Sequence, residues 1–302
     1  LKKGTAMSQV FALLGHPVGH SLSPAIQHAA YQALGVDCRY ELIDCPDEDA
    51  VRAALERLRR AELSGVNVTV PWKRVALAAA DTRHPMAARV GAANVIARDQ
   101  RGSIIAHNTD VPALVEEFRA HAASLRRFIV LGNGGAALGA VAAAFEAGAE
   151  RVLVTARRFD AVTPETSWPH AAEFSALGAR LLAWPDGSAQ ARLLFKNTLS
   201  RSDVVVQCTS AGMRGADPGD ALASLLPWEH VPRHTLAYDL VYSPAMTPFL
   251  SGARAHGLRA ENGLGMLVAQ AALSIEIWLS RAVPREPLRQ AAFDALAARG
   301  GA

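Results

Sequence analysis

The 302-residue sequence has only three cysteines, Cys38, Cys45 and Cys208, and their spacing matches no metal-binding pattern. The odd number also argues against a disulfide framework and favours a reducing compartment. Aromatic residues make up only 6% and are not interleaved with the scattered arginines, and the net charge is only +3. Neither feature is typical of a protein that binds nucleic acid.

Long apolar runs, internal repeats and low-complexity tracts are also lacking. No stretch has the length and apolarity of a transmembrane helix. Lys2 and Lys3 are followed by an apolar run of only residues 10–14, which does not fit a signal peptide. With 50% hydrophobic and 20% charged residues, the chain has the composition of a globular protein, and its length suffices for two domains. We therefore expect a cytoplasmic protein that binds no metal, membrane or nucleic acid, and the sequence leaves both a monomer and a homodimer open.

The most informative stretch covers residues 128–158. An apolar run of strand length leads into a glycine turn, then an alanine-rich segment with strong helix propensity, and then a second β-branched run. This order is the dinucleotide-binding pattern, with Gly132, Gly134 and Ala137 at the G-x-G-x-x-A positions. Glycine permits a tight turn and a close approach to a pyrophosphate, which the helix N-terminus would bind. The turn residues expected to contact the cofactor are Gly132, Asn133, Gly134, Gly135 and Ala136.

The end of the second strand indicates which nucleotide binds. NAD enzymes usually have Asp or Glu there to accept a hydrogen bond from the ribose 2′-hydroxyl. This chain instead has Ala156, Arg157 and Arg158, with no acid before Asp160. Because guanidinium groups suit a 2′-phosphate that a carboxylate would repel, Arg157 and Arg158 favour NADP. The alternative is a solvated basic strand end with no cofactor role.

A second stretch, residues 66–73, combines a strand pattern with a lysine. Asn67 and Thr69 alternate with valines, so both side chains should point to one side of a strand. Pro71 ends that strand, because proline cannot donate to a ladder, and Lys73 follows directly. The pattern indicates a lysine held beside two hydrogen-bonding side chains, although a polar face on an exposed sheet would look the same.

Other polar residues have a structural and a functional interpretation. Asp110 follows an expected strand and can cap the next helix, which does not exclude a catalytic role. Ser23 fits a helix N-cap with Pro24 behind it, and Ser21 fits a turn. Gln270 lies in an almost wholly apolar helix, so it either bonds the backbone or faces a substrate.

Nine segments resemble, in the same order, those of the shikimate dehydrogenase family, and together they cover nearly the whole chain. They are SLSP from Ser21, NVTVPWK from Asn67, GAAN from Gly91, NTD from Asn108, GNGGAA from Gly132, ARR from Ala156, CTSAGM from Cys208, DLVYSPAMT from Asp239 and NGLGMLVAQ from Asn262. The resemblance implies an α/β fold of two domains. Residues 7–110 with 251–302 would form a substrate-binding domain completed by C-terminal helices, and residues 111–250 a Rossmann domain that binds NADP.

The resemblance also implies an NADP-dependent oxidoreductase of aromatic amino acid biosynthesis that reversibly reduces 3-dehydroshikimate to shikimate. Lys73 would be the general acid or base and Asp110 its partner, because alcohol oxidation needs a base while hydride leaves the carbon. The residues implied to bind substrate are Ser21, Ser23, Asn67, Thr69, Asn94, Tyr242 and Gln270. Further residues implied to hold the cofactor are Thr209, Met213, Gly263 and Met266.

Several residues depart from the family pattern. Val111 and Pro112 stand where glycines are usual, Val95 replaces a threonine, and Gln27-His28 replaces a His-Asn pair. Gln207 replaces an asparagine, and Ala156 and Arg158 replace Asn and Thr. Because Val95 and Val111 would change the substrate pocket, one alternative is a relative acting on quinate, an aminoshikimate-like ring or another cyclic hydroxy acid. Another is a non-catalytic NADP-binding regulator, against which the presence of both Lys73 and Asp110 argues.

Overall fold

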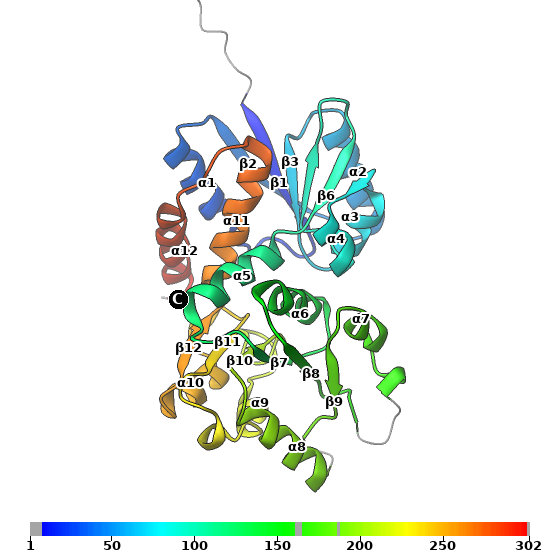
Figure 1. Cartoon of the computed structure of the whole chain (residues 1–302). Coiled ribbons are helices and arrows are strands. Elements are labelled where there is room, and N and C mark those ends of the chain that lie inside the picture. Colours follow the sequence, from blue (N-terminus) through cyan, green and yellow to red (C-terminus); the bar gives the residue numbers. More distant parts are fainter. Residues whose placement is uncertain (1–7, 161–164, 186–187, 301–302) are drawn as a thin grey trace, which may run out of the picture. The chain divides into compact units, whose positions relative to one another are not determined.

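The computed structural model describes residues 8–160, 165–185 and 188–300. The chain divides into two compact units, one of Leu1–Asp110 with Leu267–Ala302 and the other of Val111–Met266. Each unit has a six-stranded sheet with helices against it, as Figure 1 shows, so the expected α/β class is confirmed. The boundary expected after residue 250 lies after Met266, because β12 (Arg259–Asn262) pairs with β11 of the second sheet.

The first unit has the strand order β2-β1-β3-β5-β6-β4. Its strands are β1 (Gln9–Gly15), β2 (Cys38–Asp44), β3 (Gly65–Val68), β4 (Thr82–Arg83), β5 (Val95–Arg98) and β6 (Ile104–His107). β1 and β3 are parallel, whereas β5 is antiparallel to both β3 and β6. The ends of β1, β3 and β6 and the start of β5 therefore lie at one edge of the sheet. This edge collects the chain segments around Ser21, Thr69, Asn94 and Asp110.

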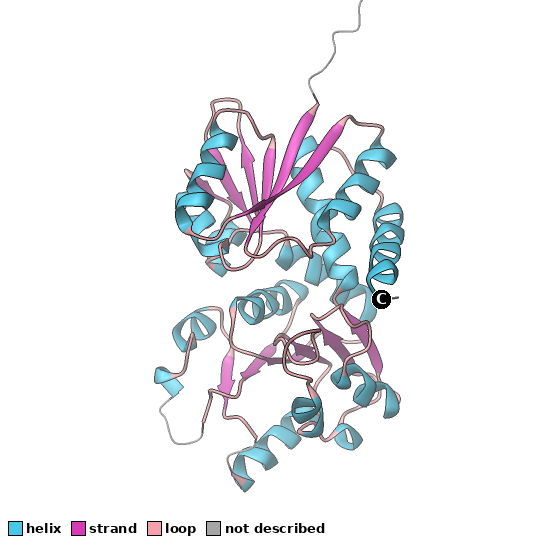
Figure 2. Ribbon diagram, turned by 180° about the vertical axis from the view of Figure 1, so that it is seen from behind, coloured by secondary structure: helices cyan, strands magenta, loops and turns pink. Residues whose placement is uncertain are grey.

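Helices cover both faces of this sheet, as Figure 2 shows. On one face lie α2 (Glu48–Arg59), α3 (Lys73–Ala79) and α4 (Pro85–Val90), and on the other α1 (Ser23–Leu34), α11 (Leu264–Leu279) and α12 (Arg285–Gly300). α2 shows why the local sequence folds this way. Asp47 caps its first turn by accepting from the Ala50 N–H at 2.8 Å, and its apolar stripe, which includes Leu55 and Leu58, is buried in the core.

The sheet of the second unit has the order β12-β11-β10-β7-β8-β9, with every neighbouring pair parallel. Its strands are β7 (Arg127–Leu131), β8 (Arg151–Thr155), β9 (Arg180–Leu182), β10 (Val204–Gln207), β11 (Leu236–Asp239) and β12. This is the doubly wound Rossmann order, in which the chain reverses direction across the sheet between β7 and β10. A ligand is expected at the carboxyl ends of these two strands, where the crossovers diverge.

The helices that follow the strands are α5 (Asp110–His121), α6 (Gly135–Ala147), α7 (Ala171–Ala176), α8 (Ala189–Leu199), α9 (Asp220–Ser224) and α10 (Pro248–Ala255). Short 3₁₀ turns occur at Glu165–Ser167 and Trp228–His230. α6 ends at Gly148, whose φ of 107° only glycine adopts readily, and its buried face is built largely of alanines. Within the described ranges, no helix has both the length and the apolarity needed to cross a membrane.

Candidate active site

Lys73 and Asp110 meet at the sheet edge of the first unit. Lys73 begins α3 just after the loop that follows β3, and Asp110 begins α5 just after β6. The Lys73 Nζ lies 2.7 Å from Asp110 Oδ2, and the side chains are 32% and 18% exposed. The pair is thus a close ion pair that a ligand can still reach.

Asn94 holds the other oxygen of the Asp110 carboxylate. Its Nδ2 donates to Asp110 Oδ1 at 2.8 Å and to Thr109 Oγ1 at 2.9 Å, and its Oδ1 accepts from the Thr109 N–H at 2.7 Å. The Thr109 hydroxyl in turn donates to the Gln270 carbonyl of α11 at 3.2 Å. Asn94, 3% exposed, therefore fixes Asp110 in position, and its two amide protons are already engaged.

Asn67 lies beneath Asn94 and is 6% exposed. Its Oδ1 accepts from the Tyr40 hydroxyl at 2.7 Å and from Gln27 Nε2 at 3.4 Å, while its Nδ2 donates to Ser274 Oγ at 2.9 Å and to the Asn94 carbonyl at 3.2 Å. Burial raises the pKa of Tyr40, which keeps its phenol protonated as a donor. A substrate could contact Asn67 only by exchanging one of these four bonds. Neither Tyr40 nor Ser274 belongs to a motif, so sequence reasoning missed both members of this network.

Ser21, Ser23 and Thr69 lie at the same edge. The Ser21 Oγ accepts a hydrogen bond from the Ser23 N–H at 3.1 Å, which leaves the Ser21 hydroxyl proton to be donated to another group. Thr69 is half-buried after β3, and a Cβ at Gly15 would overlap with its methyl group, so the glycine makes room for it. Hydroxyl donors grouped in this way suit an anionic oxygen.

Two C-terminal helices support this edge. Gln270 Nε2 donates to the Leu267 carbonyl at 2.9 Å, so the side chain bonds its own helix backbone. From α12, the Arg299 Nη1 donates to the His20 carbonyl at 2.6 Å and Nη2 to the Ser21 carbonyl at 3.0 Å. The last helix therefore fixes the loop that carries Ser21. Tyr242, the remaining residue expected to bind substrate, belongs to the second unit.

The two valines expected to alter the substrate pocket do not line a surface. Val95 and Val111 are both 0% exposed. Val95 is the first residue of β5, where it pairs with Asn67 and His107. In this structure their side chains therefore pack inside the protein and contribute no surface to a ligand site.

A pocket of about 610 Å³ lies at the carboxyl edge of the second sheet, between the turns that follow β7, β8 and β10. The expected cofactor residues that line it are Gly132, Asn133, Gly134, Arg157, Arg158 and Thr209. Gly135 and Ala136 begin α6 behind the turn, and Met213 is 45% exposed outside the lining. Gly263 and Met266 also belong to this unit but lie outside the lining residues.

The glycine turn has the geometry that a pyrophosphate needs. Gly132 has φ 129°, and a Cβ there would lie 3.2 Å from the Thr209 methyl group, so glycine is required. Gly134 is the N-cap of the 13-residue helix α6, and no atom lies within 4 Å of where its Cβ would stand. Gln207 holds the facing turn, because its amide accepts from the Thr209 N–H and donates to the Ala211 carbonyl at 2.9 Å. The helix N-terminus is therefore open to an anion.

Arg157 and Arg158 line the far end of this pocket. Arg157 is 69% exposed and pairs with Asp217 Oδ2 at 3.1 Å. The neutral wall, which no sequence motif indicated, is built from Pro169, Trp184, Leu222 and Leu225. One pocket thus combines arginines that suit a phosphate, a glycine turn that suits a pyrophosphate and a neutral wall that suits a flat ring. A nucleotide with a 2′-phosphate has all three groups.

Asp239 ends β11 near this edge and is fully buried. Burial raises its pKa to about 7, although hydrogen bonds from the Thr247 hydroxyl at 2.6 Å and the Val241 N–H at 2.9 Å favour the charged form. Burial, with a smaller effect of Asp239, also raises the pKa of the Cys208 thiol. Among the described residues, no three His, Cys, Asp or Glu side chains are grouped to hold a metal ion.

The chain matches known proteins over nearly its whole length. Residues 13–96 match the shikimate dehydrogenase substrate binding domain, and residues 263–293 the shikimate 5′-dehydrogenase C-terminal domain. A shikimate dehydrogenase (NADP⁺) of Thermus thermophilus is 38% identical over 287 residues, which is 95% of this chain and 98% of that protein. The corresponding protein of Geobacter sulfurreducens is 35% identical over 297 residues, with 97% and 98% covered.

Solved structures agree with this. The crystal structure of shikimate 5-dehydrogenase from Thermus thermophilus, in complex with NADP(H) and shikimate, has a TM-score of 0.79 and 37% identity, covering 95% of this chain and 100% of that one. The ligand-free 5-ketofructose reductase of Gluconobacter sp. strain CHM43 has a TM-score of 0.80 and 25% identity, covering 96% and 99%. On sequence and fold together, the chain belongs to the shikimate dehydrogenase family.

Proposed function

We propose that this protein is an NADP-dependent oxidoreductase that reversibly reduces 3-dehydroshikimate to shikimate. Relatives of more than a third identity bear that name, and one such structure was solved with both NADP(H) and shikimate. The observation that carries the proposal is the 2.7 Å contact between Lys73 Nζ and Asp110 Oδ2 at an accessible sheet edge. A regulator without catalysis would have no use for this pair.

The chemistry follows from the charges of the pair. In the reducing direction, the Lys73 ammonium would hold the substrate carbonyl oxygen and protonate it as negative charge develops. In the oxidising direction, the Lys73 side chain would act as the neutral amine and take the hydroxyl proton. Asp110 would orient Lys73, and Asn94 would keep the carboxylate from turning away. Bound NADPH would supply the hydride that reduces the carbonyl carbon.

Binding of the substrate is assigned to the first unit, Leu1–Asp110 with Leu267–Ala302. The hydroxyls of Ser21, Ser23 and Thr69 would donate to the substrate carboxylate. Gln270 would face the ring hydroxyls, whereas Asn94 would contact one only by exchanging its bond to Asp110 or Thr109. Because Asn67 already makes four hydrogen bonds, we now assign it to supporting Asn94 in place of a primary substrate contact.

NADP is assigned to the second unit, Val111–Met266. The N-terminus of α6 and the turn Gly132–Gly135 would bind the pyrophosphate, and Arg157 with Arg158 the 2′-phosphate. Thr209 would contact the cofactor from the facing turn, and Met213, Gly263 and Met266 would lie near the nicotinamide. Family membership and the unpaired cysteines support a cytoplasmic protein.

The test is an absorbance assay at 340 nm with NADP⁺ or NAD⁺ and shikimate or quinate in all pairings. We expect robust turnover of shikimate with NADP⁺. Turnover of quinate alone would assign the chain to the alternative substrate. NADP⁺ binding without turnover of any pair would contradict the proposed reaction.

A further inference from the structure

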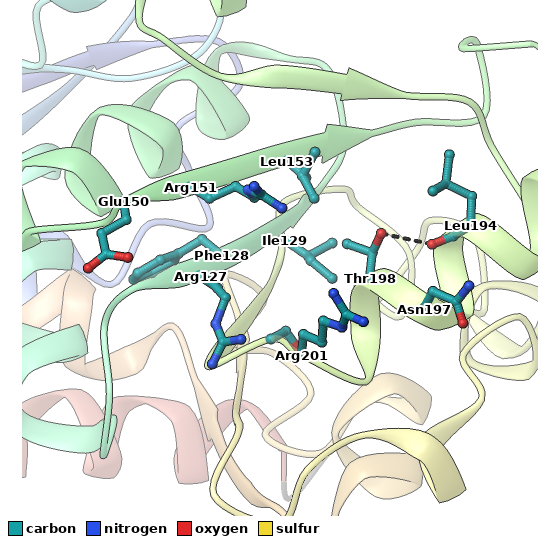
Figure 3. Close-up of a pocket in the computed structure, with 11 residues that line it drawn as sticks. Arg127, Phe128, Ile129, Glu150, Arg151, Leu153, Leu194, Asn197, Thr198 and Arg201 are labelled. Atoms are coloured by element: carbon teal, nitrogen blue, oxygen red, sulfur yellow. Dashed lines mark hydrogen bonds between the residues drawn. The ribbon is translucent and has the colours of Figure 1, made fainter.

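We propose that the second unit carries a separate binding site for a small amphiphilic carboxylate, at the amino-terminal edge of its sheet. A pocket of about 640 Å³ opens there between the first residues of β7 and β8, the C-terminal half of α8 and the loop that leads into β10 (Figure 3). Ligand pockets in proteins span about 300–1,000 Å³, so the pocket can hold a compound with one or two rings.

This pocket is distinct from the nucleotide pocket. Arg127 begins β7 and lines the first, whereas Gly132 follows the end of β7 and lines the second. A strand of five residues spans roughly 16 Å, at about 3.3 Å per residue. The two pockets therefore lie at opposite edges of the same sheet, and a ligand in one does not contact a ligand in the other.

The acidic residues at this pocket are already paired. Glu150 accepts from Arg126 Nε at 2.7 Å and Nη2 at 3.0 Å, a side-on pair of two parallel bonds. Asp203, just behind the pocket, accepts from the Arg127 N–H at 2.8 Å and lies 3.5 Å from Arg127 Nη2. The charges of Glu150 and Asp203 are thus neutralised by Arg126 and Arg127. These two carboxylates do not neutralise the remaining arginines of the pocket.

Arg151 and Arg201 remain as a surplus of positive charge. Both line the pocket and are exposed, and within the described parts of the chain neither guanidinium has a carboxylate partner. Figure 3 shows Arg127, Arg151 and Arg201 around the side chain of Ile129. Two unpaired guanidinium groups from different elements on one concave surface favour an anion between them.

Beside the polar residues Asn197, Thr198 and Ser202, the lining has an apolar part. Ile129 and Leu153 form part of the lining from neighbouring strands, and Leu194 projects from α8 with 52% of its surface exposed. An inorganic anion would contact the arginines but would leave this apolar surface in water. A carboxylate on an aromatic or aliphatic body satisfies both parts of the pocket, which is why we assign this class of ligand.

The test uses 2-naphthoate and the neutral 2-naphthalenemethanol, titrated by ligand-observed NMR into the full chain saturated with NADP⁺, so that the nucleotide pocket is filled. The naphthoate should bind at least about tenfold more tightly than the alcohol, because each charge-assisted hydrogen bond is lost in the alcohol. The double variant Arg151→Gln, Arg201→Gln should lower the affinity for naphthoate by at least about tenfold and leave the affinity for NADP⁺ unchanged.

The matched control is Arg192→Gln with Arg233→Gln, which removes the same charge from exposed positions outside the pocket. It should bind naphthoate like the unmodified protein. Equal affinity for both compounds, or an equal loss in both double variants, would overturn the proposal. The absence of any naphthoate binding to the unmodified protein would also overturn it. This holds as well if sedimentation shows that the Arg151 and Arg201 changes dissociate a dimer, because these residues would then serve the interface between subunits.

Discussion

At the residue scale, the contact between Lys73 and Asp110 makes the most direct prediction. Lys73→Met removes the cation but keeps most of the side-chain volume, so kcat should fall by about 100- to 10,000-fold, the usual worth of a general acid or base. NADP⁺ affinity, measured by fluorescence titration, should stay the same because the pair lies in the first unit. Arg74→Met, at the exposed neighbouring position, is the control. An unchanged kcat in Lys73→Met would remove Lys73 from the mechanism.

The ion pair of Arg157 with Asp217 makes a second prediction, about cofactor choice. Arg157→Gln should lower the affinity for NADP⁺ by about tenfold or more and change the affinity for NAD⁺ little, because only NADP⁺ has the 2′-phosphate that the guanidinium would bind. Asp217→Asn should have the opposite effect and raise the affinity for NADP⁺ by about threefold. The change frees Arg157, 3.1 Å away, and removes a carboxylate that would repel the 2′-phosphate. The dissociation constants of both nucleotides decide this. Equal losses for both in Arg157→Gln would place the 2′-phosphate elsewhere.

At the element scale, the end of β11 predicts a pH dependence of stability. Asp239 is fully buried with a pKa raised to about 7, whereas an unfolded aspartate titrates near about 3.9. Between these values the folded chain binds more protons than the unfolded chain, so the free energy of unfolding falls as the pH rises from about 4 to about 7. At most about 4 kcal/mol is lost across this window.

Asp239→Asn cannot ionise and should therefore remove this part of the pH dependence. The urea midpoints of the two proteins, each at pH 5 and pH 7.5, provide the measurement. The midpoint of the unmodified protein should fall between the two pH values more than that of the variant. Identical falls would show that Asp239 has the same pKa in the folded and unfolded chain.

The start of α11 depends on a glycine that contacts α5. A Cβ at Gly265 would overlap with the carboxylate of Glu117, which is 8% exposed and accepts from the Tyr238 hydroxyl at 3.1 Å. Gly265→Ala should therefore destabilise the chain by about 1–3 kcal/mol. The control is Gly139→Ala in α6, where no atom lies within 4 Å of the new Cβ and the change should be neutral or stabilising by up to about 1 kcal/mol. Thermal midpoints that fall equally in both would contradict this.

At the scale of the whole molecule, the sequence predicted the fold class and the long elements, because their patterns are local. The Rossmann unit was visible in one stretch, residues 128–158. β12, by contrast, is only Arg-Ala-Glu-Asn, and α8 was not predicted. β12 is a strand because β11 pairs with it, and no local pattern carries that information.

The site divides in the same way. Lys73, Asp110 and the glycine turn could be named because motifs of adjacent residues carry them. The partners that fix them could not, since Ser274 is 207 positions from the Asn67 that it bonds and Asp217 is 60 positions from Arg157. Such pairs form only when the topology brings separate elements to one edge. Sequence patterns therefore indicate candidate catalytic residues more readily than the contacts that position them.

The last helix acts on the loop that carries Ser21 in this way, across 279 positions. Arg299 holds the His20 and Ser21 carbonyls from α12, whose Leu288 and Ala292 are fully buried. Arg299→Gln should leave the thermal midpoint nearly unchanged, because the side chain is exposed, but should raise the KM for shikimate by about five- to tenfold as the loop loses two charge-assisted hydrogen bonds. Arg289→Gln, exposed on the same helix and paired with Glu286 at 4.0 Å, should change neither quantity. If Arg299→Gln lowers kcat and leaves KM unchanged, Arg299 does not serve substrate binding through Ser21.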